Sequence, residues 1–309
     1  MSTALPETML AVVLDGAGPP EALDIRTVPL PAVPSDHVLI ALDYASVGSW
    51  DAKLRSGDWG DVKPGTVPGV DGSGRIAAVG DGVEGFNAGD RVYSYSYGND
   101  RGGFYAEYVS VPANLVAHVP AQIDQAVAGA MPCAGLTAHS GLRALEVERE
   151  ESLLVFGASG GVGSMAVWLA ARAIGASVTG TAKPDAFDYL LKLGAAYAVE
   201  PQDSQFKHGF DAALFTTNGD TSNRWGAHLH RGAALAYPNG VEPEPQVPNH
   251  EAIAFDGEMS RAALDEFNKA IGTQTIPLNV DVYPFDRVVD AHRRIEAGHV
   301  IGKIVLQIR

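Results

Sequence analysis

The run from Leu153 to Gly163 has the residue types and spacing needed to hold the diphosphate of a dinucleotide. An apolar segment ends at Phe156 in a cluster of small residues, and an apolar helical pattern begins at Met165. Small residues let backbone N–H groups approach phosphate oxygens, and the helix N-terminus adds favourable partial positive charge. The G-x-G-x-x-G spacing is kept, except that alanine replaces the first glycine. The cofactor-binding residues expected here are Ala158, Ser159, Gly160, Gly161, Val162 and Gly163. A glycine-rich turn without a ligand is the alternative.

The next apolar segment indicates which nicotinamide cofactor is bound. Proteins that select NAD usually place a carboxylate at the end of the second strand, where it binds the ribose 2′-hydroxyl. Here the segment 176–179 continues into Gly180-Thr181-Ala182-Lys183, without a carboxylate at the strand end. Thr181 is suited to hydrogen-bond a 2′-phosphate and Lys183 to neutralise it, which favours NADPH. Asp185 is the alternative acid, although Pro184-Asp185 is more typical of a helix start.

Composition excludes several classes of partner. The chain has 309 residues, enough for two domains with separate cores. Lys and Arg total 22 against 37 Asp and Glu, a net charge of −15. That balance opposes binding to nucleic acid or to anionic lipid. No apolar run approaches the roughly 20 residues that a membrane span requires.

Cysteine usage favours a cytoplasmic protein. Cys133 is the only cysteine, so an intrachain disulfide is excluded. The segment 1–9 has no basic residue and no apolar core, and it predicts no signal peptide.

The elements change character along the chain. Residues 9 to 120 are predicted to be mostly strands and turns, and from about Ile123 helix-like and strand-like segments alternate. Such alternation predicts βαβ units around a parallel sheet. Pro238 to Glu258, rich in proline and acid, is predicted to be a surface excursion, followed finally by a helix over 285–297 and a strand over 303–308.

Several segments, in order, resemble the medium-chain dehydrogenase/reductase superfamily, and specifically its zinc-free quinone oxidoreductase (zeta-crystallin-like) branch. They are the 46–57 run SVGSWDAKLRSG, the 68–74 run PGVDGSG, the 89–92 run GDRV, the 103–108 run GFYAEY, the 135–138 run GLTA, the 158–163 turn, the 193–195 run LGA and the 302–306 run GKIVL. The similarity therefore covers essentially the whole chain.

The resemblance implies an α/β protein with two domains. A GroES-like, β-rich catalytic domain would comprise residues 1–124 and 276–309, and a Rossmann domain with a doubly wound parallel sheet would comprise residues 125–275. It also implies an active site in the cleft between the domains.

Zinc ligation is not expected. The positions that bind catalytic zinc in alcohol dehydrogenases of this superfamily correspond to Gly48, Val70 and Asp71, and glycine and valine cannot ligate a metal. The segment matching the structural zinc site contains no cysteine. His228 and His230 are more typical of a solvated surface pair than of a metal site.

The resemblance also implies further site residues. Thr137 occupies a position that contacts the nicotinamide end, with a helix-start hydroxyl as the alternative. Tyr237 and Asn239 follow the strand that leads to the nicotinamide, although Pro-Asn-Gly also suits a turn. Tyr44, Gly48 and Trp50 are expected in the substrate pocket, with Trp59 as a further aromatic wall. An aromatic and basic pair that relatives often carry near Glu200-Pro201 is missing here.

Without zinc, the chemistry favours acceptors that are already electrophilic. A quinone or an α,β-unsaturated carbonyl accepts hydride without a Lewis acid, whereas alcohol oxidation must manage an alkoxide. Relatives usually carry Asn and Tyr at the positions of Gly48 and Lys53. The candidate catalytic residues are Lys53, to protonate or polarise a carbonyl, and Asp51, to fix local geometry or contact the nicotinamide ribose. The alternatives are that Lys53 projects into solvent and that Asp51 is a buried structural carboxylate.

The predicted function is NADPH-dependent reduction of quinones or α,β-unsaturated carbonyls. One alternative is a non-catalytic NADPH-binding protein, similar to some lens crystallins of this branch. The other is an enoyl reductase of a biosynthetic pathway. The resemblance also implies a homodimer formed by extending the Rossmann sheet edge to edge.

Overall fold

The computed structural model describes residues 5–99, 102–203, 205–217 and 222–309, and these form two compact units. Unit 1 comprises residues 1–133, 259–268 and 280–309, and unit 2 comprises residues 134–258 and 269–279. None of the helices in the described ranges combines the length and hydropathy that crossing a bilayer requires.

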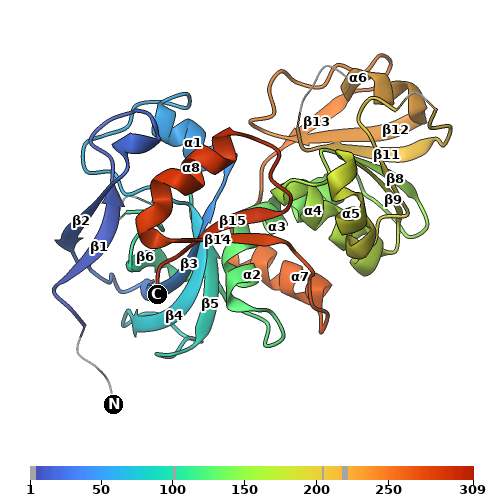
Figure 1. The fold of residues 1–309 in the computed structure, drawn as a ribbon. Coiled ribbons are helices and arrows are strands. Elements are labelled where there is room, and N and C mark those ends of the chain that lie inside the picture. Colours follow the sequence, from blue (N-terminus) through green and yellow to red (C-terminus); the bar gives the residue numbers. More distant parts are fainter. Residues whose placement is uncertain (1–4, 100–101, 204, 218–221) are drawn as a thin grey trace. The chain divides into compact units, whose positions relative to one another are not determined.

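Unit 1 is built on a mixed, mainly antiparallel sheet (Figure 1). Its strand order is β14-β15-β3-β4-β5-β7, with β6 also pairing with β3. These strands are β3 (His37–Val47), β4 (Asp71–Val79), β5 (Arg91–Tyr95), β6 (Tyr108–Pro112), β7 (Val116–His118), β14 (Val280–Pro284) and β15 (Lys303–Gln307). The helices are α1 (Ser49–Ser56), α2 (Gln125–Ala130) and α8 (Val288–Glu296), with short 3-10 turns η2 (Ala113–Leu115) and η6 (Phe285–Arg287).

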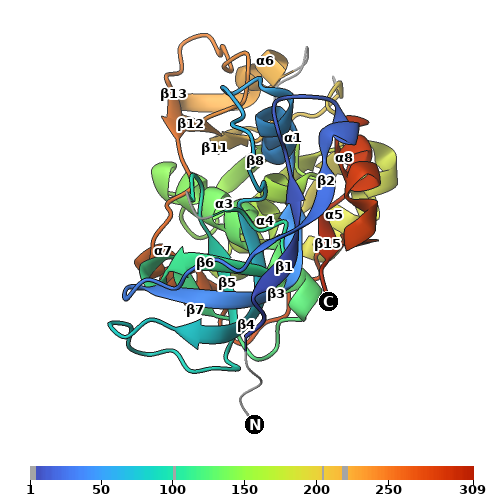
Figure 2. The same cartoon turned by 90° about the vertical axis from the view of Figure 1, so that its left-hand side faces the viewer.

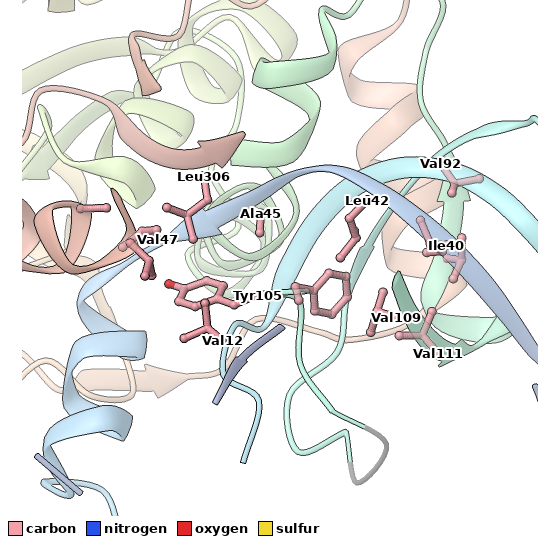
Figure 3. Packing of buried hydrophobic residues seen from close by; sticks show 14 of the residues in the cluster. Val12, Ile40, Leu42, Ala45, Val47, Val92, Tyr105, Val109, Val111 and Leu306 are labelled. Atoms are coloured by element: carbon pink, nitrogen blue, oxygen red, sulfur yellow. The ribbon is translucent and has the colours of Figure 1, made fainter. Parts of the chain in front are cut away.

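A hairpin of β1 (Thr8–Val13) and β2 (Asp24–Pro29) completes unit 1, with the turn η1 (Pro20–Ala22) between its strands. Figure 2 shows this hairpin beside α8, where Arg293 Nε donates to Glu21 Oε1 at 3.1 Å. The core lies against β3, whose inward residues Ile40, Leu42 and Ala45 are fully buried (Figure 3). Ile40 and Leu42 share a face because successive side chains of a strand point to opposite sides. Between Leu42 and Tyr44 the pairing of β3 with β4 shifts register, and Ala45, three residues after Leu42, joins the same cluster.

Unit 2 contains a six-stranded, wholly parallel sheet in the order β10-β9-β8-β11-β12-β13. Its strands are β8 (Ser152–Phe156), β9 (Ser177–Thr181), β10 (Tyr197–Val199), β11 (Phe210–Phe215), β12 (Leu229–Pro238) and β13 (Ala252–Phe255). In sequence order this is 3-2-1-4-5-6, the doubly wound order of the Rossmann fold. The parallel sheet predicted from the sequence is therefore confirmed.

Helices cover both faces of that sheet. They are α3 (Pro132–Ala144), α4 (Gly161–Trp168) continuing as the π-helical turn η3 (Leu169–Ile174), α5 (Phe187–Leu193) after η4 (Pro184–Ala186), and α6 (Ser222–Trp225) with η5 (Gly226–His228). A Cβ on Gly141 of α3 would lie 2.9 Å from Leu214, which places this helix directly on β11. The neighbouring Phe215 belongs to the opposite cluster, with Trp225.

One expectation about organisation needs correction. The proline-rich stretch 238–258 contains β13, which pairs with β12 as the sixth strand and buries Phe255, so it is more than a surface excursion.

The domain boundaries at 124/125 and 275/276 stay a prediction, and the compact units divide the chain at other positions. Residues 125–133 group with unit 1, where Ser73 Oγ donates to the Gln125 carbonyl at 2.9 Å. Most of α7 (Arg261–Ile271) does too, because Tyr93 Oη donates to Asn268 Oδ1 at 2.6 Å.

Candidate functional site

The segment from Gly157 to Gly163, between β8 and α4, is called the coenzyme turn here. Its shape depends on the glycines at its two ends. Gly157 follows β8 with φ of +81°, a left-handed conformation that favours glycine. A Cβ on Gly163 would lie 2.3 Å from the Gly157 carbonyl oxygen and 2.7 Å from Ala158 Cα. Only glycine therefore permits α4 to approach the turn this closely. At Gly160 the nearest atom to such a Cβ is 3.7 Å away, so packing inside the protein does not require glycine there.

The first turn of α4 contains the backbone N–H groups that are predicted to bind phosphate. Gly160 is the N-cap residue, and the N–H groups of the first helical residues have no partner within the helix. Ser159, Gly160, Gly161 and Val162 are partly exposed, whereas Ala158 and Gly163 are buried. The predicted turn thus divides into residues that can face a ligand and residues that fix its shape. Free N–H groups at a helix N-terminus are suited to a dinucleotide diphosphate.

Thr181 has a different role from the predicted one. Its side chain is 1% exposed, and its Oγ1 accepts the Gly157 N–H at 3.0 Å. The Thr181 carbonyl also accepts the Ala158 N–H at 3.0 Å. Thr181 therefore ties the end of β9 to the coenzyme turn, and its burial argues against the expected contact with a 2′-phosphate.

Lys183 stays the predicted contact for a 2′-phosphate. It follows the carboxyl end of β9, its side chain is exposed, and it caps the short turn η4. Asp185 lies within the first turn of that element, as a helix-start residue does. The arrangement therefore separates the exposed cation at the strand end from the acid in the helix start.

Two threonines beside the coenzyme turn were missed by the sequence analysis. Thr216 Oγ1 donates to the carbonyls of Phe156 at 2.9 Å and Gly157 at 3.0 Å. A Cβ on Gly157 would lie 2.5 Å from Thr217 Cγ2. Both threonines follow β11, which adjoins β8 where the strand order reverses, the usual ligand position in such sheets. Polar residues directly after a buried apolar strand were the available signal.

The remaining predicted cofactor residues lie around α3 and β12. Thr137 is in the middle of α3, 8% exposed, so it is not the helix-start hydroxyl of the alternative. A Cβ on Gly257 would lie 2.7 Å from its Oγ1. Tyr237 is 5% exposed within the hydrophobic cluster, so it packs in the core. Asn239 is exposed after β12, and its N–H donates to the Phe255 carbonyl at 2.8 Å.

In unit 1, Trp50 and Lys53 of helix α1 lie beside two aromatic rings from outside the helix, Trp59 and Tyr97. The Trp50 and Trp59 ring centroids are 3.7 Å apart, and Tyr97 meets Trp50 edge-on at 5.2 Å. Lys53 Nζ lies 4.6 Å from the Trp59 ring centroid, a cation–π geometry. Lys53, Trp50 and Trp59 are half-buried and Tyr97 is exposed. An apolar, partly open surface with an ammonium beside it suits a planar carbonyl compound.

Tyr44 does not belong to this aromatic group. It lies on β3 opposite Ser73, and a Cβ on Gly129 of α2 would lie 2.5 Å from its Cβ. Burial, followed by the charges of Asp124 and Asp43, raises the pKa of its hydroxyl. Its expected place in the substrate pocket stays a prediction without support from its contacts.

Asp51 caps the start of α1 from inside the unit. Its Oδ2 accepts the Gly48 N–H at 2.8 Å, and its Oδ1 is enclosed without a hydrogen-bond partner. Burial and then the nearby charge of Asp71 raise the pKa of Asp51 to about 7. Asp71 Oδ2 accepts the Cys133 N–H at 2.9 Å, and burial raises the pKa of Asp71 as well. Two carboxyl groups thus share a site out of water, which disfavours the state with both ionised.

A second buried polar group adjoins the first. Tyr105 Oη lies 3.2 Å from His292 Nε2, and burial followed by the Arg55 charge lowers the His292 pKa to about 3. Arg55, 1% exposed, is hydrogen-bonded to Glu296. Among the described residues no group of three or more His, Cys, Asp or Glu side chains is arranged to hold a metal ion. Burial raises the pKa of the Cys133 thiol to about 12, which keeps it protonated.

Comparison with known proteins identifies the two halves of the sequence. The family described as alcohol dehydrogenase GroES-like domain matches residues 34–121, and the family described as zinc-binding dehydrogenase matches residues 187–306. These matches, together with the parallel sheet, confirm the predicted fold class.

Individual relatives extend over almost the whole chain. The 2-methylene-furan-3-one reductase of Solanum lycopersicum is 30% identical, over 99% of this chain and 80% of that protein. The NADPH-dependent alkenal/one oxidoreductase, chloroplastic, of Arabidopsis thaliana is 30% identical, over 98% of this chain and 80% of that protein. The structure of the quinone oxidoreductase from Coxiella burnetii superposes with a TM-score of 0.86 at 25% identity, covering 98% of this chain and 100% of that chain. With these matches, the chain belongs to the medium-chain dehydrogenase/reductase superfamily, in its quinone oxidoreductase branch.

Proposed function

We propose that this protein is an NADPH-dependent reductase of quinones or α,β-unsaturated carbonyl compounds. The observation that carries the proposal is the coenzyme turn, where Gly163 lets α4 pack within contact of Ala158. The names of the alkenal/one, furanone and quinone reductases among its relatives support the same substrate class. When bound, NADPH supplies the hydride, and the protein supplies binding, orientation and protons.

The preference for NADPH over NADH rests on Lys183. Its exposed ammonium at the end of β9 is suited to pair with a 2′-phosphate, and no carboxylate stands at that strand end to bind a 2′-hydroxyl. Thr181 is buried and contributes by holding the turn. Ser159 to Val162 face the diphosphate, Ala158 and Gly163 fix the shape of the turn, and Thr137 and Asn239 remain the proposed contacts near the nicotinamide.

The substrate side of the reaction is assigned to α1. Lys53 polarises the substrate carbonyl, while the rings of Trp50, Trp59 and Tyr97 pack against its planar, conjugated part. Asp51 holds the N-terminal end of the helix through the Gly48 N–H. Gly48 contributes space instead of a side chain. Since Gly48 and Val70 stand at the zinc-ligand positions, we propose that the reaction proceeds without zinc.

A coenzyme titration tests this proposal. NADPH and NADH affinities are measured by fluorescence for wild type, Lys183→Ala and the control Lys192→Ala, an exposed lysine on α5. Losing one charge-assisted contact costs about 1–3 kcal/mol, a roughly 5- to 150-fold weaker affinity for NADPH alone. Wild type should also oxidise NADPH steadily with phenanthrenequinone, and a chelator should leave this rate unchanged. A wild-type preference for NADH would contradict the cofactor assignment.

The second candidate is a non-catalytic NADPH-binding protein. It is favoured by Gly48 and Lys53, which replace the Asn and Tyr that are usual in the branch. Tight NADPH binding without turnover of quinones or enones would select this candidate over the reductase.

The quaternary state and location complete the proposal. We place a homodimer contact at β13, the edge strand of the unit 2 sheet, where Ile253 is 41% exposed. Unpaired edge strands readily pair with a second chain. The Cys133 thiol, whose raised pKa keeps it protonated, suits the reducing cytoplasm. Sedimentation velocity tests the dimer, and a monomer at micromolar concentration would contradict it.

A further inference from the structure

The ammonium of Lys303 lies beside the space that Gly48 leaves open. Lys303 begins β15, and the next residue, Ile304, pairs with Val47, the residue before Gly48. A Cβ on Gly48 would lie 3.8 Å from Lys303 Nζ and 3.6 Å from Asp51 Oδ2. The two groups therefore border one small space at the N-terminal end of α1.

Lys303 is buried along its stem but not sealed at its tip. The residue is 9% exposed, and its ammonium forms no hydrogen bond or ion pair within the described residues. Nζ is also absent from the fully enclosed polar atoms that lack partners, so it retains accessible surface. A lysine with a buried stem and an accessible, unpaired ammonium has donor capacity left for a ligand.

Two carboxyl groups and one ammonium lie around this space, so their charges balance when one of the two carboxyl groups is protonated. Asp51 and Asp71 are 3% and 1% exposed, and Lys303 is the cation whose charge acts on both. One ammonium balances one carboxylate, so the cluster is neutral when the second carboxyl is protonated. Burial keeps the hydroxyl of Tyr105 and the thiol of Cys133 protonated at neutral pH, so neither exchanges readily. The exchangeable proton therefore resides on Asp51, where the pKa is raised to about 7.

We propose that Lys303 and Asp51 are the proton-donating pair of the reduction, with Lys303 touching the substrate. The inference rests on the proposed function. Hydride addition to the β-carbon of an enone leaves an enolate, which takes a proton from the Lys303 ammonium at its α-carbon. That step breaks an N–H bond and forms a C–H bond. The Lys303 amine then regains a proton from the Asp51 carboxylic acid across the space beside Gly48, and Asp51 is reprotonated from water.

Two variants separate proton donation from simple charge balance. Lys303→Arg keeps the positive charge that neutralises Asp51 and Asp71, but a guanidinium does not release a proton at neutral pH. Gly48→Ala keeps both groups and adds a methyl to the space between them. The Gly48 backbone is extended and the nearest atoms to its Cβ are 3.6–3.9 Å away, so the alanine fits without strain. The matched control is Lys192→Arg on the surface of α5.

The measurement uses NADPH and an enone with a methyl group on its α-carbon, so that protonation creates a stereocentre. Wild type should give one enantiomer. Lys303→Arg should lower kcat by about 100-fold, the usual contribution of general acid catalysis, and give a nearly racemic product as solvent protonates the enolate. Gly48→Ala should lower kcat less and reduce the enantiomeric excess. Lys192→Arg should match wild type in both respects.

The outcomes distinguish the two proposals. Absence of NADPH oxidation by wild type with any enone or quinone would remove the proposed function itself. An active wild type whose Lys303→Arg variant keeps its kcat and its enantiomeric excess would overturn the proton-donating pair alone. A falling kcat with unchanged enantiomeric excess would likewise overturn the pair, because the α-carbon would still receive its proton on the same face from another donor.

Discussion

The two units prepare for their ligands with different parts of the chain. In unit 2 the coenzyme turn is mostly backbone, formed by consecutive residues from Gly157 to Gly163 and shaped by the absence of side chains. In unit 1 the polar cluster consists of three side chains from separate elements, and its charged groups are buried. They are Asp51 of α1, Asp71 of β4 and Lys303 of β15. The first site is therefore sensitive to added volume, while the second is sensitive to charge and pH.

The largest expected effect tests sensitivity to volume in unit 2. Gly163→Ala would place a methyl 2.3 Å from the Gly157 carbonyl oxygen, and the three atoms nearest to that methyl all belong to the backbone of Gly157 and Ala158. We expect a loss of about 3 kcal/mol in the free energy of unfolding, the upper end for overpacking, because backbone cannot rotate away. NADPH binding should fall with it, since the turn must shift. Urea unfolding and a coenzyme titration measure the two effects.

Gly160→Ala is the matched control within the same turn. Its Cβ has no neighbour closer than 3.7 Å, so the free energy of unfolding should change by less than about 0.5 kcal/mol. NADPH should still bind more weakly, because the methyl stands where the diphosphate approaches. Equal destabilisation by the two alanines would contradict the division of the turn into a packing glycine and a ligand-facing glycine.

The next effect tests the sensitivity of unit 1 to pH. Asp51 has its pKa raised from 3.8 to about 7, so the folded state holds the proton more tightly and stability falls as pH rises from about 4 through 7. His292 has its pKa lowered from 6.5 to about 3, so the folded state resists protonation and stability is lost as pH falls from 6.5 toward 3. Between about pH 4 and 6.5 the two trends oppose each other.

Single substitutions should expose each trend. Asp51→Asn should leave a protein whose free energy of unfolding rises between pH 4 and 6.5, relative to wild type. His292→Gln should leave one whose free energy of unfolding falls over the same interval. Urea unfolding at intervals of half a pH unit, without coenzyme, gives both curves. Parallel curves for all three proteins would show that neither group titrates differently in the folded chain.

The contrast between the units also explains what the sequence could reveal. The coenzyme turn was predictable because its residues are consecutive and their spacing reports the strand, turn and helix directly. The position of Lys183 was predictable for the same reason, since it follows the end of β9 by two residues. The pairing of Gly48 with Lys303 depends on β15 lying beside β3, a contact between residues some 250 positions apart that no local pattern encodes.

Burial is the second property that the sequence concealed. Thr181 and Tyr237 have side chains suited to ligand contact, yet both are enclosed within unit 2. Conversely, Thr216 was not among the predicted site residues. Its Oγ1 donates to the carbonyls of Phe156 and Gly157, where the strand order of the sheet reverses. Residue type indicates which hydrogen bonds a side chain can form, whereas the fold determines whether its partner is a group of the protein or a ligand.

The smallest expected effect concerns Thr181, where the predicted and observed roles diverge most. Thr181→Val keeps the shape of the side chain but removes the oxygen that accepts the Gly157 N–H at 3.0 Å. Leaving this buried donor unpaired should lower the free energy of unfolding by about 1 kcal/mol. Because the side chain is enclosed, the ratio of NADPH to NADH affinity should not change, whereas Lys183→Ala should alter it. If Thr181→Val instead kept the wild-type stability and lost the discrimination between NADPH and NADH, Thr181 would contact the 2′-phosphate through its side chain, as the sequence predicts.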